Sequence, residues 1–446
     1  MNIHTIILAA GKGTRMNTNL PKVMQPLGGQ TLISHVINTA KASSENITVV
    51  VGHKKDLLRE HIAAIDPKIK ITDQDEQLGT AHAVKTASHM IQDDEKILIL
   101  YGDVPLISSS TIDSLISAQQ ECTLLSMHLP DPTGYGRIMT DDQSNALKII
   151  EQKDASAEEA LIHEVFTGIL LINGSLLKAS LEEINNQNAA NEYYLTDLVE
   201  ILSLKGVKIN CIQANPTEVV GANNKKELHE LEAILRNMSA EKLLDQGITL
   251  LDASRVDVRG EVVAGKDCSV DVNVIFEGKV SLGENVIIKS NVVLQDVSIG
   301  DHSIIESFSH LSSATVGSNC NIGPYARLRE GSEIGDNAKI GNFVETKKTR
   351  LGDGAKANHL AYLGDADIGS KTNIGAGTIT CNYDGVNKHK TIIGKRAFIG
   401  SNSSLIAPIN IGDDANVAAG SSISKNVDSN SLAITRAPIR LSLIHI

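Results

Sequence analysis

Hydrophobic residues recur at every sixth position over the second half of the chain, from about residue 256 onward. Counting by sixes from Val274 to Ile340 meets an aliphatic residue at ten of twelve positions, where chance gives roughly a third. Ser298 and His310 are the two exceptions, and the count resumes over 393–423. A six-residue period is typical of a parallel β-helix, in which stacked coils together bury one aliphatic residue per hexad.

The N-terminal half of the chain, 1–224, follows a different pattern, in which short apolar runs alternate with amphipathic stretches. The apolar runs predict strands over 3–10, 47–51, 97–101 and 122–129, and the stretches between them predict helices over 31–41, 80–91 and 109–118. This alternation indicates a mainly parallel sheet with helices on both faces. Residues 137–172 predict more strands, mixed or antiparallel. We therefore expect an α/β protein whose residues 1–224 form a Rossmann-like domain with a mixed sheet.

A single helix separates the two patterns. Apolar residues share one helical face over 225–246, and Gly247 ends the helix. We interpret 225–247 as a linker and 248–446 as a left-handed parallel β-helix of hexapeptide repeats. The polar segment 382–389 interrupts the period and must leave the coil as a loop, which is where binding groups tend to lie.

Composition narrows the function classes. The 446 residues carry a formal charge of -12, which argues against non-specific binding to nucleic acid. The five cysteines are scattered and have no CxxC spacing, which indicates reduced thiols in a cytoplasmic protein without a zinc site. The first ten residues have no basic region, so we expect no signal peptide. No apolar run approaches the roughly 18 residues that span a bilayer, so we expect no membrane segment.

A glycine-rich loop, Gly11-Lys12-Gly13-Thr14-Arg15, follows the first predicted strand. It would place backbone N–H groups and basic side chains at the carboxyl edge of a parallel sheet, where phosphates bind in such folds. Lys22 supplies further positive charge. The GxxxxGK[ST] spacing of a P-loop is absent, and a plain tight turn explains this segment equally well.

Asp103 lies in a second candidate segment. It follows Tyr101 and Gly102 at the end of the apolar strand predicted over 97–101. An aspartate at the end of a buried parallel strand is well placed to hold Mg²⁺. For a lone aspartate, a helix cap or a turn is the commoner role.

Several motifs, taken in order, resemble a known family. LAAGKGTRM, EQLGTAHA, YGDVPL, PTGYGRI, EYYLTD and GANN follow the order seen in sugar-1-phosphate nucleotidyltransferases. NHLAYLGDADIG and NIGAGTITCNYDG lie within the hexapeptide region. Together they resemble the bacterial family that joins an N-acetylglucosamine-1-phosphate uridyltransferase to a glucosamine-1-phosphate N-acetyltransferase. The resemblance covers nearly the whole chain.

The resemblance implies an enzyme that acetylates glucosamine-1-phosphate with acetyl-CoA and then transfers UMP from UTP to N-acetylglucosamine-1-phosphate. It would supply precursors of peptidoglycan and lipopolysaccharide. In the N-terminal domain, Arg15 and Lys22 would assist catalysis, and Asp103 and Asn223 would hold Mg²⁺. The implied nucleotide and sugar contacts are Leu8, Ala9, Ala10, Gly11, Lys22, Gln74, Gly79, Thr80, Tyr101, Gly102, Asp103, Gly136, Glu151 and Asn223.

In the hexapeptide domain, His359 is the candidate general base, because an imidazole is suited to accept a proton near neutral pH. The resemblance implies that Glu345 orients its ring and that the domain assembles as a homotrimer. It also implies that glucosamine phosphate binds to Arg329, Lys347, Tyr362 and Asn373. The implied acetyl-CoA contacts are Ala376, Asn382, Tyr383, Lys388, Ser401, Ala419 and Arg436.

Three features depart from the family pattern. Phe166 stands where the family has an asparagine in its sugar-binding strand, so we expect altered affinity for the sugar. Glu330 stands where the family usually has a proline, beside Arg329. The chain also lacks the basic tail common in relatives, because its last six residues are LSLIHI.

Three alternatives remain at this point. A nucleotidyltransferase with a purely structural β-helix explains the N-terminal half but not His359, Glu345 and Lys347 together. A non-catalytic scaffold leaves the retained Lys22 and Asp103 unexplained. A γ-class carbonic anhydrase would need a zinc-binding trio of histidines, which this sequence does not supply.

Overall fold

A computed structural model describes residues 2–435, 439 and 442 of the chain. The chain divides into two compact units, Met1–Leu235 and Arg236–Ile446. The boundary falls inside helix α7 (Lys225–Asp245), within the segment predicted as the linker. Among the described residues, no helix is long and apolar enough to span a membrane.

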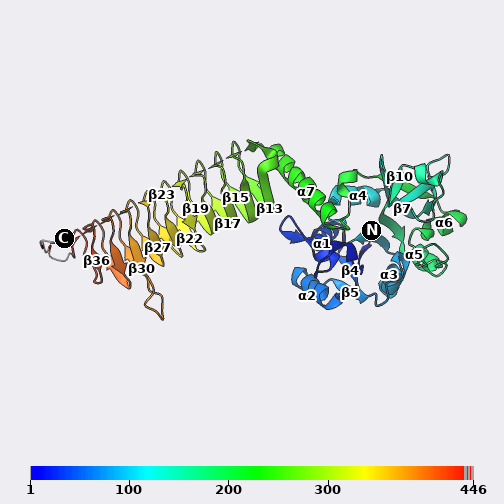
Figure 1. The fold of residues 1–446 in the computed structure, drawn as a ribbon, viewed down its shortest axis with the longest axis horizontal. Helices are drawn as coiled ribbons and strands as arrows, with labels where there is room; N and C mark the ends of the chain where they lie inside the picture. Colours follow the sequence, from blue (N-terminus) through cyan, green and yellow to red (C-terminus); the bar gives the residue numbers. More distant parts are fainter. Residues whose placement is uncertain (1, 436–438, 440–441, 443–446) are drawn as a thin grey trace. The chain divides into compact units, whose positions relative to one another are not determined.

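The first unit is built on a mixed sheet with the strand order β11-β7-β10-β6-β1-β4-β5, to which β8 and β9 add an antiparallel pair (Figure 1). Its strands are β1 (Ile3–Ala9), β4 (Asn46–Val51), β5 (Lys70–Asp73), β6 (Lys96–Tyr101), β7 (Cys122–His128), β8 (Gly136–Thr140), β9 (Ala146–Ile150), β10 (Glu164–Asn173) and β11 (Ile209–Gln213). A two-stranded ribbon of β2 (Pro26–Leu27) and β3 (Gln30–Thr31) lies apart from this sheet. Strand β10 runs antiparallel to β6 and β7, which confirms the mixed sheet.

Helices cover both faces of this sheet, as the alternating pattern predicts. They are α1 (Leu32–Ser43), α2 (Lys55–Ile65), α3 (Thr80–Ala87), α4 (Ser109–Ser117), α5 (Gly174–Leu181) and α6 (Asp197–Leu204). All seven residues of β1 are buried, because this central strand has a hydrophobic cluster on each side. The helix predicted over 80–91 is shorter than expected: α3 ends at Ala87 and a 3₁₀ turn follows over Ser88–Met90.

The second unit is a parallel β-helix, as the six-residue period predicts (Figure 1). One sheet consists of β12 (Thr249–Leu250), β14 (Ser269–Val270), β16 (Ile287–Ile288), β18 (Ile304–Ile305), β20 (Asn321–Ile322), β23 (Lys339–Asn342), β26 (Lys356–His359), β29 (Asn373–Ile374), β32 (Phe398–Ile399), β35 (Asn416–Val417) and β37 (Leu432–Ala433). A second sheet begins with β13 (Val256–Ala264), β15 (Val274–Leu282), β17 (Val293–Ile299) and β19 (His310–Val316).

Beyond β19 this second sheet forks, because β19 pairs with both β21 and β22. One branch is β21 (Arg327–Leu328), β24 (Glu345–Lys347), β27 (Tyr362–Gly364), β30 (Ile379–Cys381), β33 (Ser404–Ile406) and β36 (Ser422–Ile423). The other is β22 (Ser332–Ile334), β25 (Arg350–Leu351), β28 (Ala366–Ile368), β31 (Thr391–Ile393) and β34 (Ile409–Ile411). Each later coil therefore adds one strand to each of three parallel sheets.

The packing of the coils corrects the prediction of one buried residue per hexad. A small or branched residue and a larger one, two positions apart, are both buried, as at Val274 and Phe276. The repeat also slips by a single position between two coils. Ile275 pairs with Val293, and an unbroken repeat would then pair Val280 with Ser298, but Val280 pairs with Val297 instead.

This slip changes which side chains point inward. Ser298 and His310 are exposed and Ile304 is half-buried, although the unbroken count places all three on the axis. Ile299 and Ile305 are buried in their place. A second slip follows before Val316. From there the original count again meets buried residues, now at the position of the larger inward side chain in each hexad.

We predict effects of very different size on stability for two neighbouring substitutions. Ile299→Ala removes axial packing that the coils on both sides share, so it should lower the free energy of unfolding by about 2–5 kcal/mol. Ser298→Ala changes an exposed side chain and should shift it by less than about 0.5 kcal/mol. Urea titration of the full chain measures both. Equal destabilisation by the two variants would contradict the slipped register.

Candidate functional sites

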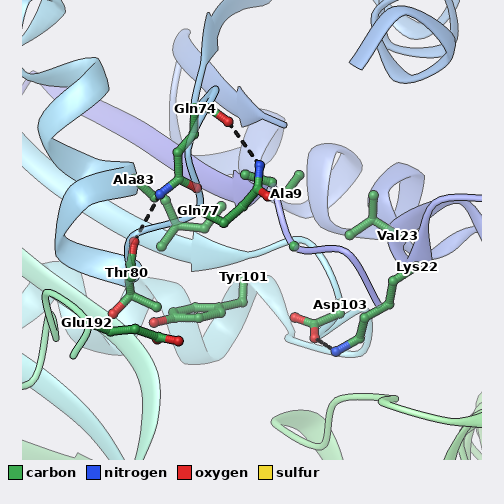
Figure 2. A pocket seen from close by; sticks show the side chains of 14 residues that line it. Ala9, Lys22, Val23, Gln74, Gln77, Thr80, Ala83, Tyr101, Asp103 and Glu192 are labelled. Carbon is green, nitrogen blue, oxygen red and sulfur yellow. Dashed lines mark hydrogen bonds and ion pairs between the residues drawn. The ribbon is translucent and has the colours of Figure 1, made fainter. Parts of the chain in front are cut away.

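A cavity of about 250 Å³ opens in the first unit at the carboxyl ends of β1 and β6. Figure 2 shows Lys22 and Asp103 on one side of it, with Gln74 and Thr80 on the opposite side. The predicted residues that line the cavity are Leu8, Ala9, Ala10, Gly11, Lys22, Gln74, Gly79, Thr80, Tyr101 and Asp103. Val23, Gln77, Ala83 and Glu192 complete the lining. Gly102 lies between two of the lining residues.

The glycine-rich loop follows β1 directly. Gly13 has a φ of 58°, a left-handed conformation that glycine adopts most easily. A Cβ added to Gly13 would lie 2.5 Å from the Cβ of Lys22, so only glycine lets the loop pack this closely against that side chain. The loop therefore packs directly against a lysine of the cavity wall.

A cluster of cations and oxygens includes Lys22 and Asp103 of the cavity lining and extends beyond it. The Lys22 ammonium makes an ion pair with the Asp103 carboxylate and donates a hydrogen bond of 2.8 Å to Asn223 Oδ1. Arg15 Nη2 donates to the same amide oxygen at 3.0 Å. The predicted catalytic cations and the predicted metal ligands therefore lie together, although Asn223 comes from a segment far along the chain from both cations.

Glu227, at the start of α7, fixes the orientation of Asn223. Its Oε2 accepts hydrogen bonds from the Asn223 backbone N at 2.7 Å and from Nδ2 at 3.0 Å. The amide oxygen is thereby directed toward the cations and Asp103. Two oxygens that converge on one positive charge fit a Mg²⁺ ion, which usually takes one or two protein ligands together with substrate phosphates. The described residues contain no group of three or more His, Cys, Asp or Glu side chains that could hold a metal.

The remaining predicted sugar contacts lie outside the lining of this cavity. Gly136 is adjacent to Glu151, since a Cβ added to it would lie 3.7 Å from Glu151 Oε1. Glu151 lines a separate cavity of about 370 Å³ that also contains Asp197. Burial raises the pKa of the Glu151 carboxyl, and burial beside Glu151 raises the pKa of Asp197 to about 6. The predicted contacts thus lie partly in the cavity that contains Lys22 and Asp103 and partly in a separate cavity that contains Glu151.

Phe166, the departure in the sugar-binding strand, is buried at 6% exposure. It packs in the hydrophobic cluster that contains Ile138, Ile149 and Leu170, and it pairs with Gly136 across the sheet. A buried phenyl ring cannot donate the hydrogen bond expected from an asparagine. The expectation of altered sugar affinity stays a prediction.

In the second unit, several predicted residues occupy the same corner of successive coils. His359 lies three positions after Lys356. In the sheet, Lys356 is aligned with Asn373, Phe398 and Asn416 of the three coils that follow. The positions that correspond to His359 in those later coils are Ala376, Ser401 and Ala419. The predicted base and three predicted acetyl-CoA contacts thus form one column. The same position in the coil before His359 is Asn342.

The polar loop leaves the coil where the period breaks. The loop connects β30 to β31 and lengthens its coil, because Ala366 pairs with Thr391, 25 positions further on, whereas Arg350 pairs with Asp367, 17 positions further on. Asn382 is buried at the base of the loop, and Tyr383 and Lys388 close it as an isolated antiparallel bridge. Backbone hydrogen bonds from Asn387, with a further bond from His389, lower the pKa of Asp384 to about 2. The predicted contact Arg436 lies outside the described residues.

A third cavity, of about 370 Å³, lies over the sheet branch that carries the predicted phosphate-binding residues. Its lining includes Arg329 and Lys347, and also His310 and Arg327, which sequence reasoning did not assign. Lys347 Nζ is 3.2 Å from Glu330 Oε1, and this lysine lowers the pKa of the Glu330 carboxyl. Glu330 is therefore paired with Lys347, one of the two cations predicted to bind the sugar phosphate.

Within one chain, Glu345 and His359 have different hydrogen-bond partners. Glu345 Oε1 accepts a hydrogen bond of 2.7 Å from Arg329 Nη1, and it stands beside Tyr362 in the sheet. The ring of His359 is instead bonded through Nδ1 to Asn342 Oδ1, at 2.9 Å. The two residues thus belong to separate pairs within one chain, and the role of Glu345 in orienting the His359 ring stays a prediction. Asn373 lies on the neighbouring sheet, in the coil that follows His359.

Besides His310, Arg327 and Asn342, sequence reasoning missed three polar side chains at these sites, Gln77, Glu192 and Glu227. Gln77 and Glu192 belong to the quoted motifs EQLGTAHA and EYYLTD, so motif membership could have identified them. Glu227 had no comparable signal, because it lies in an ordinary helical segment.

Comparison with known proteins agrees with this two-part organisation. Residues 5–141 match the MobA-like NTP transferase domain, 313–348 match the bacterial transferase hexapeptide (six repeats), and 390–425 match the hexapeptide repeat of succinyl-transferase. The bifunctional protein GlmU of Idiomarina loihiensis is 48% identical over 444 residues, which cover 99% of this chain and 97% of that protein. The bifunctional protein GlmU of Marinobacter nauticus is 46% identical over 442 residues, with 98% and 97% covered.

Glu330→Gln should strengthen phosphate binding in the third cavity, because it releases Lys347 and removes a negative charge. We expect the Kd for glucosamine-1-phosphate, measured by calorimetry on the full chain, to fall roughly twofold to fivefold. Glu333→Gln removes an exposed acid from another face of the same coil and serves as the control. A Kd that is unchanged in Glu330→Gln, or lowered equally by both substitutions, would contradict competition at Lys347.

Proposed function

Since this chain belongs to the family of bifunctional GlmU proteins, we propose that its two units carry out successive steps of UDP-N-acetylglucosamine synthesis. The protein is a bifunctional uridyltransferase and acetyltransferase. The second unit acetylates glucosamine-1-phosphate, and the first transfers UMP to the product. The observation that carries this assignment is that one chain holds two chemically different sites, one around Lys22 and Asp103 and the other around His359.

In uridyl transfer, a phosphate oxygen of N-acetylglucosamine-1-phosphate attacks the α-phosphorus of UTP, and pyrophosphate leaves. The attacking oxygen is already ionised, so no protein nucleophile is required. The main demand is to neutralise two anions that must approach each other. Lys22 and Arg15 supply this charge at the carboxyl edge of the sheet, where the glycine-rich loop receives the phosphates.

Asp103 and Asn223 would hold Mg²⁺ in this site. The bound ion would neutralise phosphate charge on the nucleotide. With the metal bound, the Lys22 ammonium would turn from Asp103 toward a phosphate oxygen. Glu227 keeps the oxygen of Asn223 directed into the site through both of its hydrogen bonds.

In acetyl transfer, the amine nitrogen of glucosamine-1-phosphate forms a bond to the thioester carbonyl carbon of acetyl-CoA. The carbon–sulfur bond then breaks and coenzyme A leaves as its thiol. His359 accepts the proton that the amine loses, and this proton can pass to the leaving sulfur. Arg329 and Lys347 bind the sugar phosphate, with Tyr362 and Asn373 beside it. The corner column and the loop around Tyr383 receive acetyl-CoA.

The second unit carries an apolar ladder that supports assembly as a homotrimer. The ladder comprises Phe308, Tyr325, Phe343 and Leu360, exposed at 51%, 47%, 55% and 62%. Successive rings stack with centroids 5.0 and 5.3 Å apart. All four residues have positive φ, a conformation that costs roughly 1–2 kcal/mol for a residue with a Cβ. Such exposed apolar surface is typical of a protein interface, and Leu360 directly follows His359, so a neighbouring subunit would adjoin the acetyl-transfer site.

Two single substitutions should separate the activities. His359→Ala removes the base and should abolish acetyl transfer while leaving uridyl transfer nearly intact. Asp103→Ala removes a metal ligand and should do the reverse, and chelation of Mg²⁺ should likewise stop uridyl transfer. Each half-reaction is assayed by itself, by release of coenzyme A or of pyrophosphate. Loss of both activities in either folded variant would refute the two-site assignment.

Substitution in the ladder should dissociate the assembly. We expect Phe343→Ser to lower the mass measured by sedimentation and to reduce acetyl transfer, while uridyl transfer persists. Phe398→Ser removes an equally exposed phenyl ring, at 51% exposure, from outside the ladder and should change neither. An unaltered mass in Phe343→Ser would show that the ladder is not the interface.

A further inference from the structure

The ring of His359 has a defined hydrogen-bond partner within its own chain. Its Nδ1 lies 2.9 Å from Asn342 Oδ1. An amide oxygen has no hydrogen to donate, so the ring must donate from Nδ1–H. A neutral imidazole that carries its proton on Nδ1 has its lone pair on Nε2. Among the contacts of the described residues, this is the ring's one hydrogen bond.

The stacking of two coils determines this contact. Strands β23 and β26 run parallel with Asn342 opposite His359, and the Leu360 backbone N donates to the Asn342 carbonyl oxygen at 3.0 Å. Gly341 permits the approach, because a Cβ added there would lie 1.9 Å from the Asn358 carbonyl oxygen. A backbone bond and a glycine-dependent close approach therefore hold Asn342 against the ring.

The Glu345 carboxylate of the same chain, which the family resemblance assigns to this ring, pairs with another residue. Glu345 pairs with Arg329 at 2.7 Å, and the same contact raises the pKa of that guanidinium. His359 is exposed whereas Asn342 is half-buried, so the asparagine is the more constrained partner of the two. A half-buried acceptor bonded to an exposed ring favours the tautomer that donates to it.

We propose that Asn342 is a positioning residue for acetyl transfer, which holds His359 in the Nδ1–H tautomer with Nε2 directed at the amine of the substrate. Nε2 then accepts one proton as the nitrogen–carbon bond forms. Asn342 touches no reacting atom, so it acts only through the ring. This inference rests on the acetyl transfer proposed above and identifies the group that orients its base.

Two substitutions test the role of the acceptor in the full chain. Asn342→Leu removes the acceptor at similar volume and should lower kcat for acetyl transfer on the order of 10-fold to 100-fold, with KM for both substrates nearly unchanged. Asn342→Asp keeps an oxygen acceptor but adds a negative charge that stabilises the imidazolium. It should retain most of kcat near pH 8, and the acidic limb of its kcat–pH profile should move up by about one pH unit or more.

The controls separate positioning from a purely structural role. Asn410→Leu alters an exposed asparagine on another sheet and should leave acetyl transfer unchanged. Uridyl transfer should persist in every variant. An unchanged kcat in Asn342→Leu, or an Asn342→Asp variant that is equally impaired at every pH, would overturn the inference. Wild-type protein without any acetyl transfer would instead overturn the proposed function itself.

Discussion

The close stacking of successive coils is the constraint on which the second unit depends. No coil buries its inward side chains alone, and the axial cluster forms only because each coil covers the one before it. Stacking also places equivalent corners in columns. Asn342, His359 and Ala376 are therefore neighbours because of coil geometry, although a full coil of sequence separates each from the next. The same constraint that builds the core thus brings together the residues proposed for acetyl transfer.

In the first unit, the parallel sheet plays the corresponding part. Strands β1 and β6 end at one edge, and the loop and the Asp103 segment that follow them meet there. There Lys22 makes an ion pair with Asp103 and donates a hydrogen bond to Asn223. In the proposed function, a metal and a phosphate would take over these contacts of Lys22. The sheet edge determines where these side chains meet, and their ion pair and hydrogen bond hold them together.

The sequence predicted the architecture well because both patterns are strictly local. The six-residue period and the alternation of strands and helices each follow from which faces are buried. The slip near Ser298 was missed, because two inward positions per hexad let the count pass from one buried column to the other. A period read at single positions cannot distinguish these columns.

The sequence motifs name candidate site residues but not the contacts among them. Motifs named Lys22, Asp103 and His359, but no motif specifies which side chain faces which. The partner of His359 depends on coil register, and the orientation of Asn223 depends on Glu227, a helix residue without a motif. Contacts between segments distant in sequence are determined by packing, which local patterns do not contain.

The central claim is that one chain catalyses two consecutive reactions, and product formation from the first substrates tests it most directly. The purified protein is supplied with glucosamine-1-phosphate, acetyl-CoA, UTP and Mg²⁺, and each component is omitted in turn. The account predicts UDP-N-acetylglucosamine only in the complete mixture, with N-acetylglucosamine-1-phosphate able to replace the first two components. Product from N-acetylglucosamine-1-phosphate and UTP, but none from the complete mixture, would contradict it and leave the β-helix without a catalytic role.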